Sequence, residues 1–291
     1  MPPAPQVPVD LRHEPFRGSV VVQRGLLTAD QLRARVWRRL FPDVYVYAAV
    51  PVTHQLRCRA AAGVLLPGAV VTGRSAAVLW GIDPVNDADD VELTVRPGSH
   101  PVRVPGLRVR RAAVDAREVC RRRGVRVTTP EATAVALARA LPLEDAVIAI
   151  DQLTSSGLAS LQRVQALAGA ASGAGCRRAR EACALADGLA ESPQETRVRL
   201  VLGRSGLPAP VAQLPVHHDG RFVARVDFGW PEQRVALEYD GLWHAEPGQF
   251  ARDRERLNRL QAAGWRVVFV TAGDLRRPDL VIARIADALA R

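Results

Sequence analysis

Two short runs of alternating apolar and polar residues near the end of the chain constrain its fold more than any other feature. They cover residues 221–228 and 234–239, and the segment Trp230-Pro231-Glu232-Gln233 between them has the composition of a turn. The sequence therefore predicts a β-hairpin. Strand pairing places Asp227 within one or two residues of the position opposite Glu238. Strand alternation places Asp240 on the same face as Glu238.

Helices and one more strand are expected around this hairpin. Ser192 can cap a helix that contains Glu195, because its hydroxyl can accept a hydrogen bond from a backbone N–H of the first turn. Helical spacing of apolar residues and a second short apolar run predict further elements at 250–262, 267–270 and 280–289. Together these elements predict an α/β domain over residues 191–291.

The acidic residues of this domain are candidates for a metal site. Carboxylates held close together repel one another unless a cation lies between them, and Mg²⁺ or Mn²⁺ prefers carboxylate oxygens and water. Such an ion lowers the pKa of a bound water and stabilises charge on a phosphate, as phosphodiester cleavage requires. We expect Asp227, Glu238 and Asp240 to act both as metal ligands and as catalytic acids.

Two further side chains could complete this chemistry. His244 follows Asp240 by four residues and could carry a proton to or from the reacting oxygens, because an imidazole titrates near neutral pH. Arg256, one helical turn after Asp253, could hold a phosphate through its guanidinium. An ion pair at the surface would explain Asp253 and Arg256 equally well.

Several motifs of this domain resemble the very-short-patch-repair endonucleases of the PD-(D/E)XK superfamily, in particular an actinobacterial branch. These motifs are Ser192 to Glu195, Val226-Asp227-Phe228, Ala236 to His244, Asp253 with Arg256, and Ala263 to Val267; two front segments, 73–77 and 129–133, are also similar to that branch. The resemblance implies a restriction-endonuclease-like mixed sheet flanked by helices, a metal bound by Asp227 and Glu238, and cleavage of DNA. It also implies that Glu195 supplies a further carboxylate from its helix, as a metal ligand and catalytic residue. Superfamily members usually have lysine where this chain has Asp240.

The chain contains no lysine, since all 40 of its basic residues are arginine. This excludes a Walker phosphate loop, a protein-kinase lysine and a lysine Schiff base, each of which needs an ammonium group. For a nuclease it leaves three alternatives. Asp240 adds a ligand and allows two metals, His244 replaces the missing base, or the activity is weak.

The first fifty residues predict a small lobe. Thr28 and Gln31 have the spacing of a capping box, and apolar residues from Leu32 to Leu40 recur at helical spacing. An alternating strand follows at Val44–Tyr47. This order of helix, turn and strand resembles the degenerate winged helix-turn-helix of abortive-infection (type IV) antitoxins. A small helical lobe that packs on the next domain is the alternative.

Residues 51–190 are rich in Ala, Leu and Val and are expected to be mainly helical. Helices are predicted at 53–66, 75–80, 129–141, 143–153, 158–168 and 176–190, and strands at 91–95 and 107–110. We expect a multi-domain α/β protein with parts at 1–50, 51–190 and 191–291, in which a mainly helical α+β region precedes the C-terminal domain. The four cysteines form no Cys-x-x-Cys pair, which predicts free, buried thiols.

Arginines that could contact nucleic-acid phosphates occur in two clusters of the front part. They are Arg38 and Arg39, and Arg121, Arg122 and Arg123. Residues 191–291 hold 15 arginines and 13 acids, or +2, so +8 of the formal net charge of +10 lies in residues 1–190. A nucleic-acid-binding front joined to an acid-lined catalytic part would show this distribution. Solvated, charged helix faces are the alternative.

The function expected from these features is that of a metal-dependent endonuclease that cleaves DNA, in repair or in defence against phage and mobile elements, with Mg²⁺ or Mn²⁺ as cofactor. Two alternatives remain: a non-catalytic DNA-binding regulator or antitoxin on a nuclease scaffold, and an RNA-cleaving toxin component. A homodimer would supply two sites for two strands. With neither a leader nor a long apolar segment in the sequence, we expect a cytoplasmic protein that does not contact membranes.

Overall fold

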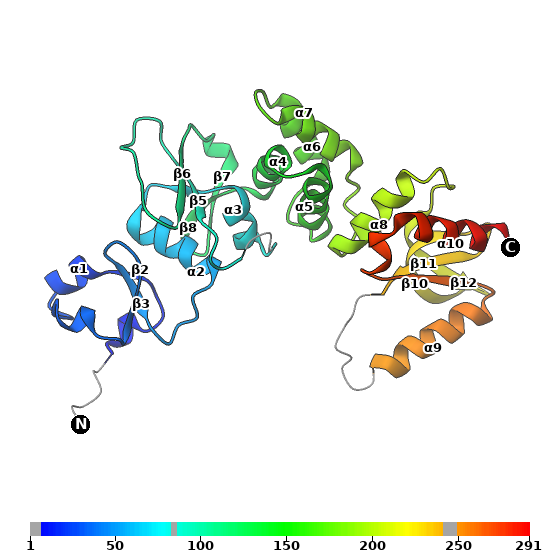
Figure 1. Cartoon of the computed structure of the whole chain (residues 1–291), viewed down its shortest axis with the longest axis horizontal. Helices are drawn as coiled ribbons and strands as arrows, with labels where there is room; N and C mark the ends of the chain where they lie inside the picture. Colours follow the sequence, from blue (N-terminus) through cyan, green and yellow to red (C-terminus); the bar gives the residue numbers. More distant parts are fainter. Residues whose placement is uncertain (1–6, 83–85, 241–248) are drawn as a thin grey trace. The chain divides into compact units, whose positions relative to one another are not determined.

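The computed structural model describes residues 7–82, 86–240 and 249–291 (Figure 1). By its internal contacts the chain forms two compact units, Met1–Ala140 and Leu141–Arg291. Both combine helices with β-sheets, which confirms a multi-domain α/β protein. Within the described ranges, no helix has the length and apolar character needed to cross a membrane.

The first unit begins with a small lobe built on three short strands. Strands β1 (Phe16–Arg17), β3 (Val44–Tyr47) and β2 (Trp37–Phe41) form an antiparallel sheet, and helix α1 (Gly18–Gln23) follows β1 directly. Phe16 and Trp37 meet edge to face, with ring centroids 5.1 Å apart, in the core of this lobe.

The helix expected from Leu32 to Leu40 is wrong. Thr28 and Gln31 do exchange the two hydrogen bonds of a capping box, at 2.7 and 3.1 Å. They cap only a 3₁₀ turn, Gln31–Arg33, because Trp37 pairs with Tyr47 and packs on Phe16 in the strand β2. The β2–β3 hairpin could serve as a wing, but among residues 7–50 the only α-helix is the six-residue α1, so no recognition helix stands beside it.

A five-stranded mixed sheet forms the main part of the first unit. Its strand order is β6 (Leu107–Arg111), β5 (Val91–Val95), β4 (Val70–Val71), β8 (Val125–Thr128) and β7 (Val119–Arg122), with β5–β6 and β4–β8 parallel. Three helices accompany it: α2 (His54–Arg59), which continues as a π-helical turn over Ala60–Leu65, α3 (Gly73–Trp80) and α4 (Pro130–Ala140). For Arg121–Arg123 the alternative of a solvated helix face is wrong, because these arginines lie on the β7–β8 hairpin.

Gly73 is required by the start of helix α3. Its φ angle is +58°, and a Cβ atom there would lie 1.9 Å from Oε2 of Glu92. That same oxygen accepts a hydrogen bond of 3.0 Å from the backbone N–H of Arg74. The absence of a side chain at residue 73 therefore lets the Glu92 carboxylate approach the first turn of α3.

The second unit begins with four helices, of which the first packs on the third and the fourth, and the second packs on the third. They are α5 (Leu143–Ser155), α6 (Leu161–Ala170), α7 (Cys176–Leu185) and α8 (Pro193–Gly203). Asp151 of α5 is fully buried and accepts hydrogen bonds from Thr196 Oγ1 and Arg199 Nη2 of α8, at 2.9 and 2.6 Å. Cys176 and Cys183 are buried free thiols, as predicted, and so is Cys58 in the first unit, while Cys120 is half-buried.

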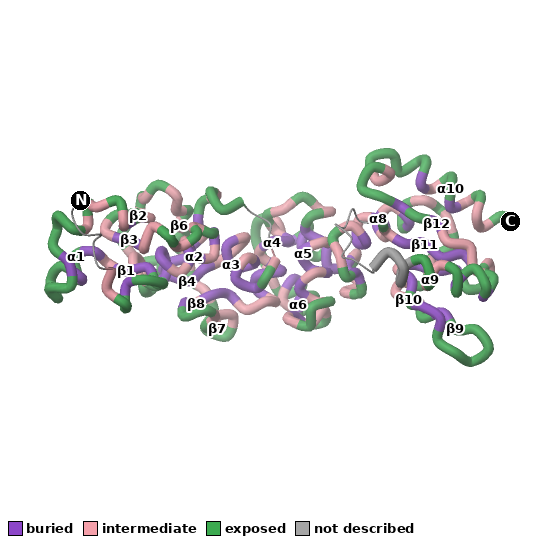
Figure 2. Tube along the Cα trace, turned by 90° about the horizontal axis from the view of Figure 1, so that it is seen from below, coloured by how far each residue is buried: buried purple, intermediate pink, exposed green. Residues whose placement is uncertain are grey.

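A four-stranded mixed sheet completes the second unit. Its order is β12 (Arg266–Val270), β11 (Val235–Tyr239), β10 (Arg221–Trp230) and β9 (Val211–His218), with only β11–β12 parallel. Helices α8 and α10 (Pro278–Ala290) pack on one apolar core of the sheet and α9 (Gln249–Ala262) on another, so that α9 and α10 lie on opposite sides (Figure 1). The inner strands are largely buried, whereas the turn between β9 and β10 is exposed (Figure 2).

Candidate functional site

The predicted hairpin places two acidic residues at the same level of the sheet. Phe228 of β10 pairs with Leu237 of β11. Because the strands are antiparallel, Asp227 and Glu238 are the adjacent residues on the side away from the turn, and they lie opposite each other. Glu238 is 5% exposed, and Asp227 is half-buried. The proximity of Asp227 and Glu238 is therefore as the sequence predicted.

Arg256 neutralises Glu238 directly. Its Nη1 donates to Oε1 of Glu238 at 2.5 Å, and its Nη2 donates to Oε2, which makes a bidentate pair between α9 and β11. Such paired bonds are the strongest arrangement of an arginine with a carboxylate. Arg256 was expected to bind phosphate, but in this arrangement its guanidinium contacts an acid of the site.

The carboxylate of Asp227 is held at the end of the hairpin. Its Oδ2 accepts a hydrogen bond of 2.8 Å from the backbone N–H of Tyr239. Burial raises the pKa of Asp227, the bond from Tyr239 lowers it, and the negative charge of Glu238 raises it further. Asp227 is thus an acid whose charged form is disfavoured by its surroundings.

Glu195 combines helix capping with proximity to Asp227. Ser192 accepts from the backbone N–H of Glu195 at 3.2 Å, as predicted, and Oε2 of Glu195 accepts from the backbone N–H of Glu191 at 2.9 Å and from Nε2 of Gln213 at 3.0 Å. Burial raises the pKa of Glu195, and the charge of Asp227 contributes in the same direction. The charge of Asp227 therefore acts on Glu195, as the charge of Glu238 acts on Asp227.

The other two predicted residues of the site are less closely involved. Asp240 is exposed, and its backbone N–H donates to the carbonyl of Val270 at 2.8 Å. His244 and the side chain of Asp253 lie outside the described residues. Among the residues that are described, no three His, Cys, Asp or Glu side chains lie close enough together to hold a metal ion.

Among the described side chains, the acidic site therefore holds no ready set of metal ligands. The guanidinium of Arg256 takes both oxygens of Glu238, so Glu238 could serve as a ligand only after this pair separates. Asp227 would remain as the nearest second donor, and Glu195 is already engaged by two N–H groups.

The predicted nucleic-acid-binding arginines differ in their surroundings. Arg38 and Arg39 are exposed on β2, and Arg121 and Arg123 are exposed on the β7–β8 hairpin. Arg122 instead donates from Nε to the carbonyl of Leu79 at 2.6 Å and lies over the Trp80 ring, 4.5 Å from its centroid. Arg122 therefore has a structural role.

Sequence reasoning missed three contributors to this region. Gln213 reaches Glu195 from β9, a strand that was not predicted, and the pairing of Asp151 with Arg199 fixes α8, which carries Glu195. The available signal was Asp151 directly after the apolar run 146–150, because a buried acid needs a partner.

Comparison with known proteins relates the chain to two groups. Residues 61–187 match the AbiEi antitoxin C-terminal domain. Uncharacterized protein Rv2248 of Mycobacterium tuberculosis strain H37Rv is 39% identical over 220 residues, which are 75% of this chain and 80% of the relative. Uncharacterized protein MT2308 of strain CDC 1551 matches to the same extent.

One solved structure is also similar, the crystal structure of the RV2827C protein of Mycobacterium tuberculosis. It is 16% identical, and the match covers 72% of this chain and 82% of that protein, with a TM-score of 0.42. The resemblance to abortive-infection antitoxins is supported in the middle of the chain, whereas the resemblance to very-short-patch-repair endonucleases stays a prediction. The chain belongs to the family of the mycobacterial proteins Rv2248 and MT2308.

Proposed function

We propose that this protein is a DNA-binding regulator of the toxin–antitoxin type. The observation that carries the proposal is the match of residues 61–187 to an antitoxin domain. The charge of the first unit supports it, because residues 1–140 hold 21 arginines and 12 acids, or +9, whereas residues 141–291 hold 19 arginines and 18 acids, or +1. An excess of arginine on one unit favours phosphate binding.

The exposed arginine pairs of the first unit are the candidate contacts with DNA. Arg38 with Arg39 and Arg121 with Arg123 are available to solvent on two hairpins. Each phosphate contact that is lost should reduce the salt dependence of binding by about one unit of slope, whatever the DNA sequence.

The proposal is tested by fluorescence anisotropy on duplexes that tile the region upstream of the protein's own coding sequence. A duplex of equal base composition and an RNA duplex of the same sequence serve as competitors. We expect one upstream DNA duplex to bind more tightly than both, and the double variants Arg38→Ala/Arg39→Ala and Arg121→Ala/Arg123→Ala to weaken it. The matched control is Arg276→Ala/Arg277→Ala, an exposed pair in the second unit. Equal binding of all duplexes would contradict the proposal.

The second candidate is cleavage of DNA at the acidic site. It is favoured by Asp227 and Glu238 on a mixed sheet flanked by helices, with Glu195 nearby on α8, since the charge of Asp227 acts on Glu195 and that of Glu238 acts on Asp227. The endonuclease resemblance implies this arrangement. With a divalent metal bound, the site would gain an activated water and a counter-charge for the phosphate. Asp227 and Glu238 would hold that metal once Arg256 had left Glu238.

A plasmid-nicking assay tests the second candidate. Wild-type protein, Asp227→Asn and the control Asp219→Asn, which changes an exposed acid of the β9–β10 turn, are each incubated with Mg²⁺, Mn²⁺ or chelator. We expect metal-dependent nicking by wild type and the control, and none by Asp227→Asn. Absence of nicking by wild type with both metals leaves the regulator as the function of the whole chain.

A further inference from the structure

Strand β6 lies at one edge of the five-stranded sheet with its outer side open. Among the described strands it pairs with β5 alone. The carbonyl of Gly106 accepts from Val91 N–H, and Ala112 N–H donates to the carbonyl of Val95, so the even-numbered residues turn their backbone groups toward β5. In a parallel pair of strands, the alternate residues, here the odd-numbered ones of β6, direct their backbone N–H and C=O groups away from the neighbouring strand. Val109 and Arg111 therefore direct N–H and C=O groups outward, where no described residue bonds them.

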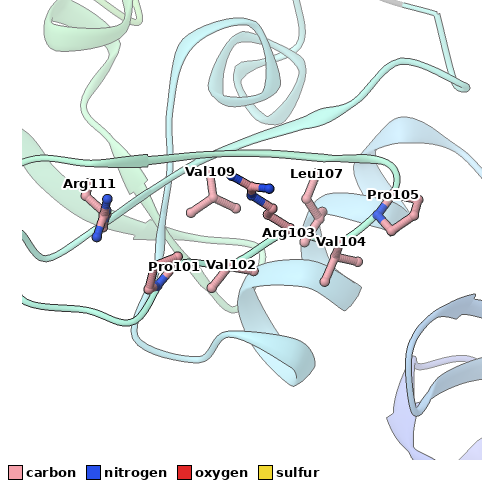
Figure 3. Close-up of a pocket in the computed structure, with 8 residues that line it drawn as sticks. All are labelled: Pro101, Val102, Arg103, Val104, Pro105, Leu107, Val109 and Arg111. Carbon is pink, nitrogen blue, oxygen red and sulfur yellow. The ribbon is translucent and has the colours of Figure 1, made fainter.

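A cleft of 690 Å³ lies along this open edge (Figure 3). It is bordered by β6 and by the extended segment Pro101–Pro105, which leads into the strand through a turn at Val104 and Leu107. The lining is mainly Val, Leu and Pro, with Arg103 from the segment and Arg111 from the strand. Such a lining can accept apolar side chains between two positive charges.

The two charged residues that line the cleft, Arg103 and Arg111, are both positive. Between residues 93 and 114 the chain holds no acid, and its five arginines are Arg96, Arg103, Arg108, Arg110 and Arg111. Arg108 lies 3.8 Å from Glu92, but Arg103 and Arg111 make no ion pair or hydrogen bond with any described side chain. The cleft therefore complements an acidic ligand.

We propose that β6 binds an extended acidic segment of a partner protein, which adds to the sheet as a sixth strand. The open N–H and C=O groups would supply the main-chain bonds, the apolar lining would receive alternate side chains, and Arg103 and Arg111 would pair with acids. The arginines repel a second copy of β6, which protects the edge from self-association while admitting an acidic strand. A nucleic acid fits less well, since no aromatic residue lines the cleft to stack on bases.

The test uses the full-length protein and a fluorescein-labelled peptide of alternating Val and Glu, about nine residues long so that it spans β6 and its flanks. Two control peptides carry Lys in place of Glu, or N-methyl groups on alternate amides. We expect saturable binding of the Val-Glu peptide alone. Arg103→Ala/Arg111→Ala should weaken it about tenfold or more, whereas Arg276→Ala/Arg277→Ala should not.

The backbone contribution is tested at Val109. Val109→Pro removes the outward N–H without touching the bonds to β5 and should abolish binding, while Val109→Ala should retain it. Hydrogen exchange of the wild type should slow at the amides of Val109 and Arg111 when the peptide is saturating, a readout that does not depend on how Val109→Pro folds.

Three results would overturn the proposal. They are no saturable binding of the Val-Glu peptide, equal binding of the N-methylated peptide, and no protection of the Val109 and Arg111 amides at saturation. Displacement of the peptide by a single-stranded oligonucleotide, with binding of that oligonucleotide dependent on Arg103 and Arg111 but not on the amide of Val109, would assign the cleft to nucleic acid instead.

Discussion

The carboxylate of Glu238, 5% exposed on β11, receives both terminal nitrogens of Arg256 from α9. Removing either partner leaves a charge in a poorly solvated place, whereas removing both does not. Arg256→Met and Glu238→Gln should therefore each lower the free energy of unfolding by about 1.5–3 kcal/mol, the range for hydrogen bonds to charged groups. The double variant should lose less than the sum.

Urea unfolding of the four proteins measures this coupling in a double-mutant cycle. Arg259→Ala, an exposed arginine on the same helix, is the control and should change stability little. Additive losses would mean that the pair contributes nothing beyond its separate side chains.

Asp227→Asn should stabilise the second unit at neutral pH. Burial raises the pKa values of Asp227 and Glu195 above their ordinary values of 3.8 and 4.5, so the folded chain binds more protons than the unfolded chain between the ordinary and the raised values. The free energy of unfolding therefore falls as pH rises through that window. Asparagine removes this contribution at residue 227 and can still accept from Tyr239 N–H.

The measurement is the difference in urea midpoint between Asp227→Asn and wild type as a function of pH. The variant should have the higher urea midpoint at pH 7, and the difference should shrink as pH falls toward 3.8, the ordinary pKa of an aspartate. Asp219→Asn, in the exposed β9–β10 turn, should show no such trend. A variant less stable than wild type at pH 7 would show that the Asp227 carboxylate is a net stabilising group.

Asp151→Ala should destabilise the second unit strongly. Asp151 is fully buried and accepts from the backbone N–H groups of Asp187 and Gly188, from Thr196 and from Arg199. Its loss removes the acceptor of the two backbone N–H groups and of the Thr196 hydroxyl, and one partner of Arg199, and should cost about 3–5 kcal/mol. Asp145→Ala is the control, because Asp145 is a half-exposed partner of Arg197 at 3.6 Å and should cost less than about 1 kcal/mol. Chemical denaturation compares them, and similar losses would refute the special role of Asp151.

The two units should differ in their affinity for DNA. A fragment of residues 1–140, with +9, should bind duplex DNA with a steep dependence on salt between about 50 and 200 mM, and a fragment of residues 141–291, with +1, should bind weakly without metal. Anisotropy measures both after circular dichroism has shown that each is folded. Equal affinities would mean that the arginine excess does not mark a DNA-binding surface.

Local patterns were sufficient for most of the second unit. Ser192 caps α8, alternation identified β10 and β11, and helical spacing identified α9 and α10. The approach of Asp227 to Glu238 followed from the hairpin alone. These features depend on residues close in sequence, where capping and periodicity act directly.

The remaining features depend on contacts between distant residues. Arg256 stands one turn from Asp253, which suggested a surface pair, but the packing of α9 on the sheet directs it to Glu238. In the N-terminal lobe, the apolar spacing from Leu32 to Leu40 suggested a helix. Residues 37–41 form the strand β2 instead, because Trp37 pairs with Tyr47 of β3. On β7 the consecutive arginines conceal the alternation that marks a strand, whose neighbour β8 buries Val125 and Val127.

The bonds from Asp151 to Thr196 and Arg199 bear on how this chain can be divided. The segment similar to the antitoxin domain ends at residue 187, yet Asp151 within that segment relies on donors that lie beyond it. A cut at residue 187 would separate the buried carboxylate of Asp151 from its partner Arg199. The helices at 143–185 and the acidic sheet should therefore be inherited, exchanged and expressed as one piece, and a recombination junction is better tolerated near residue 140 than at the end of the family match.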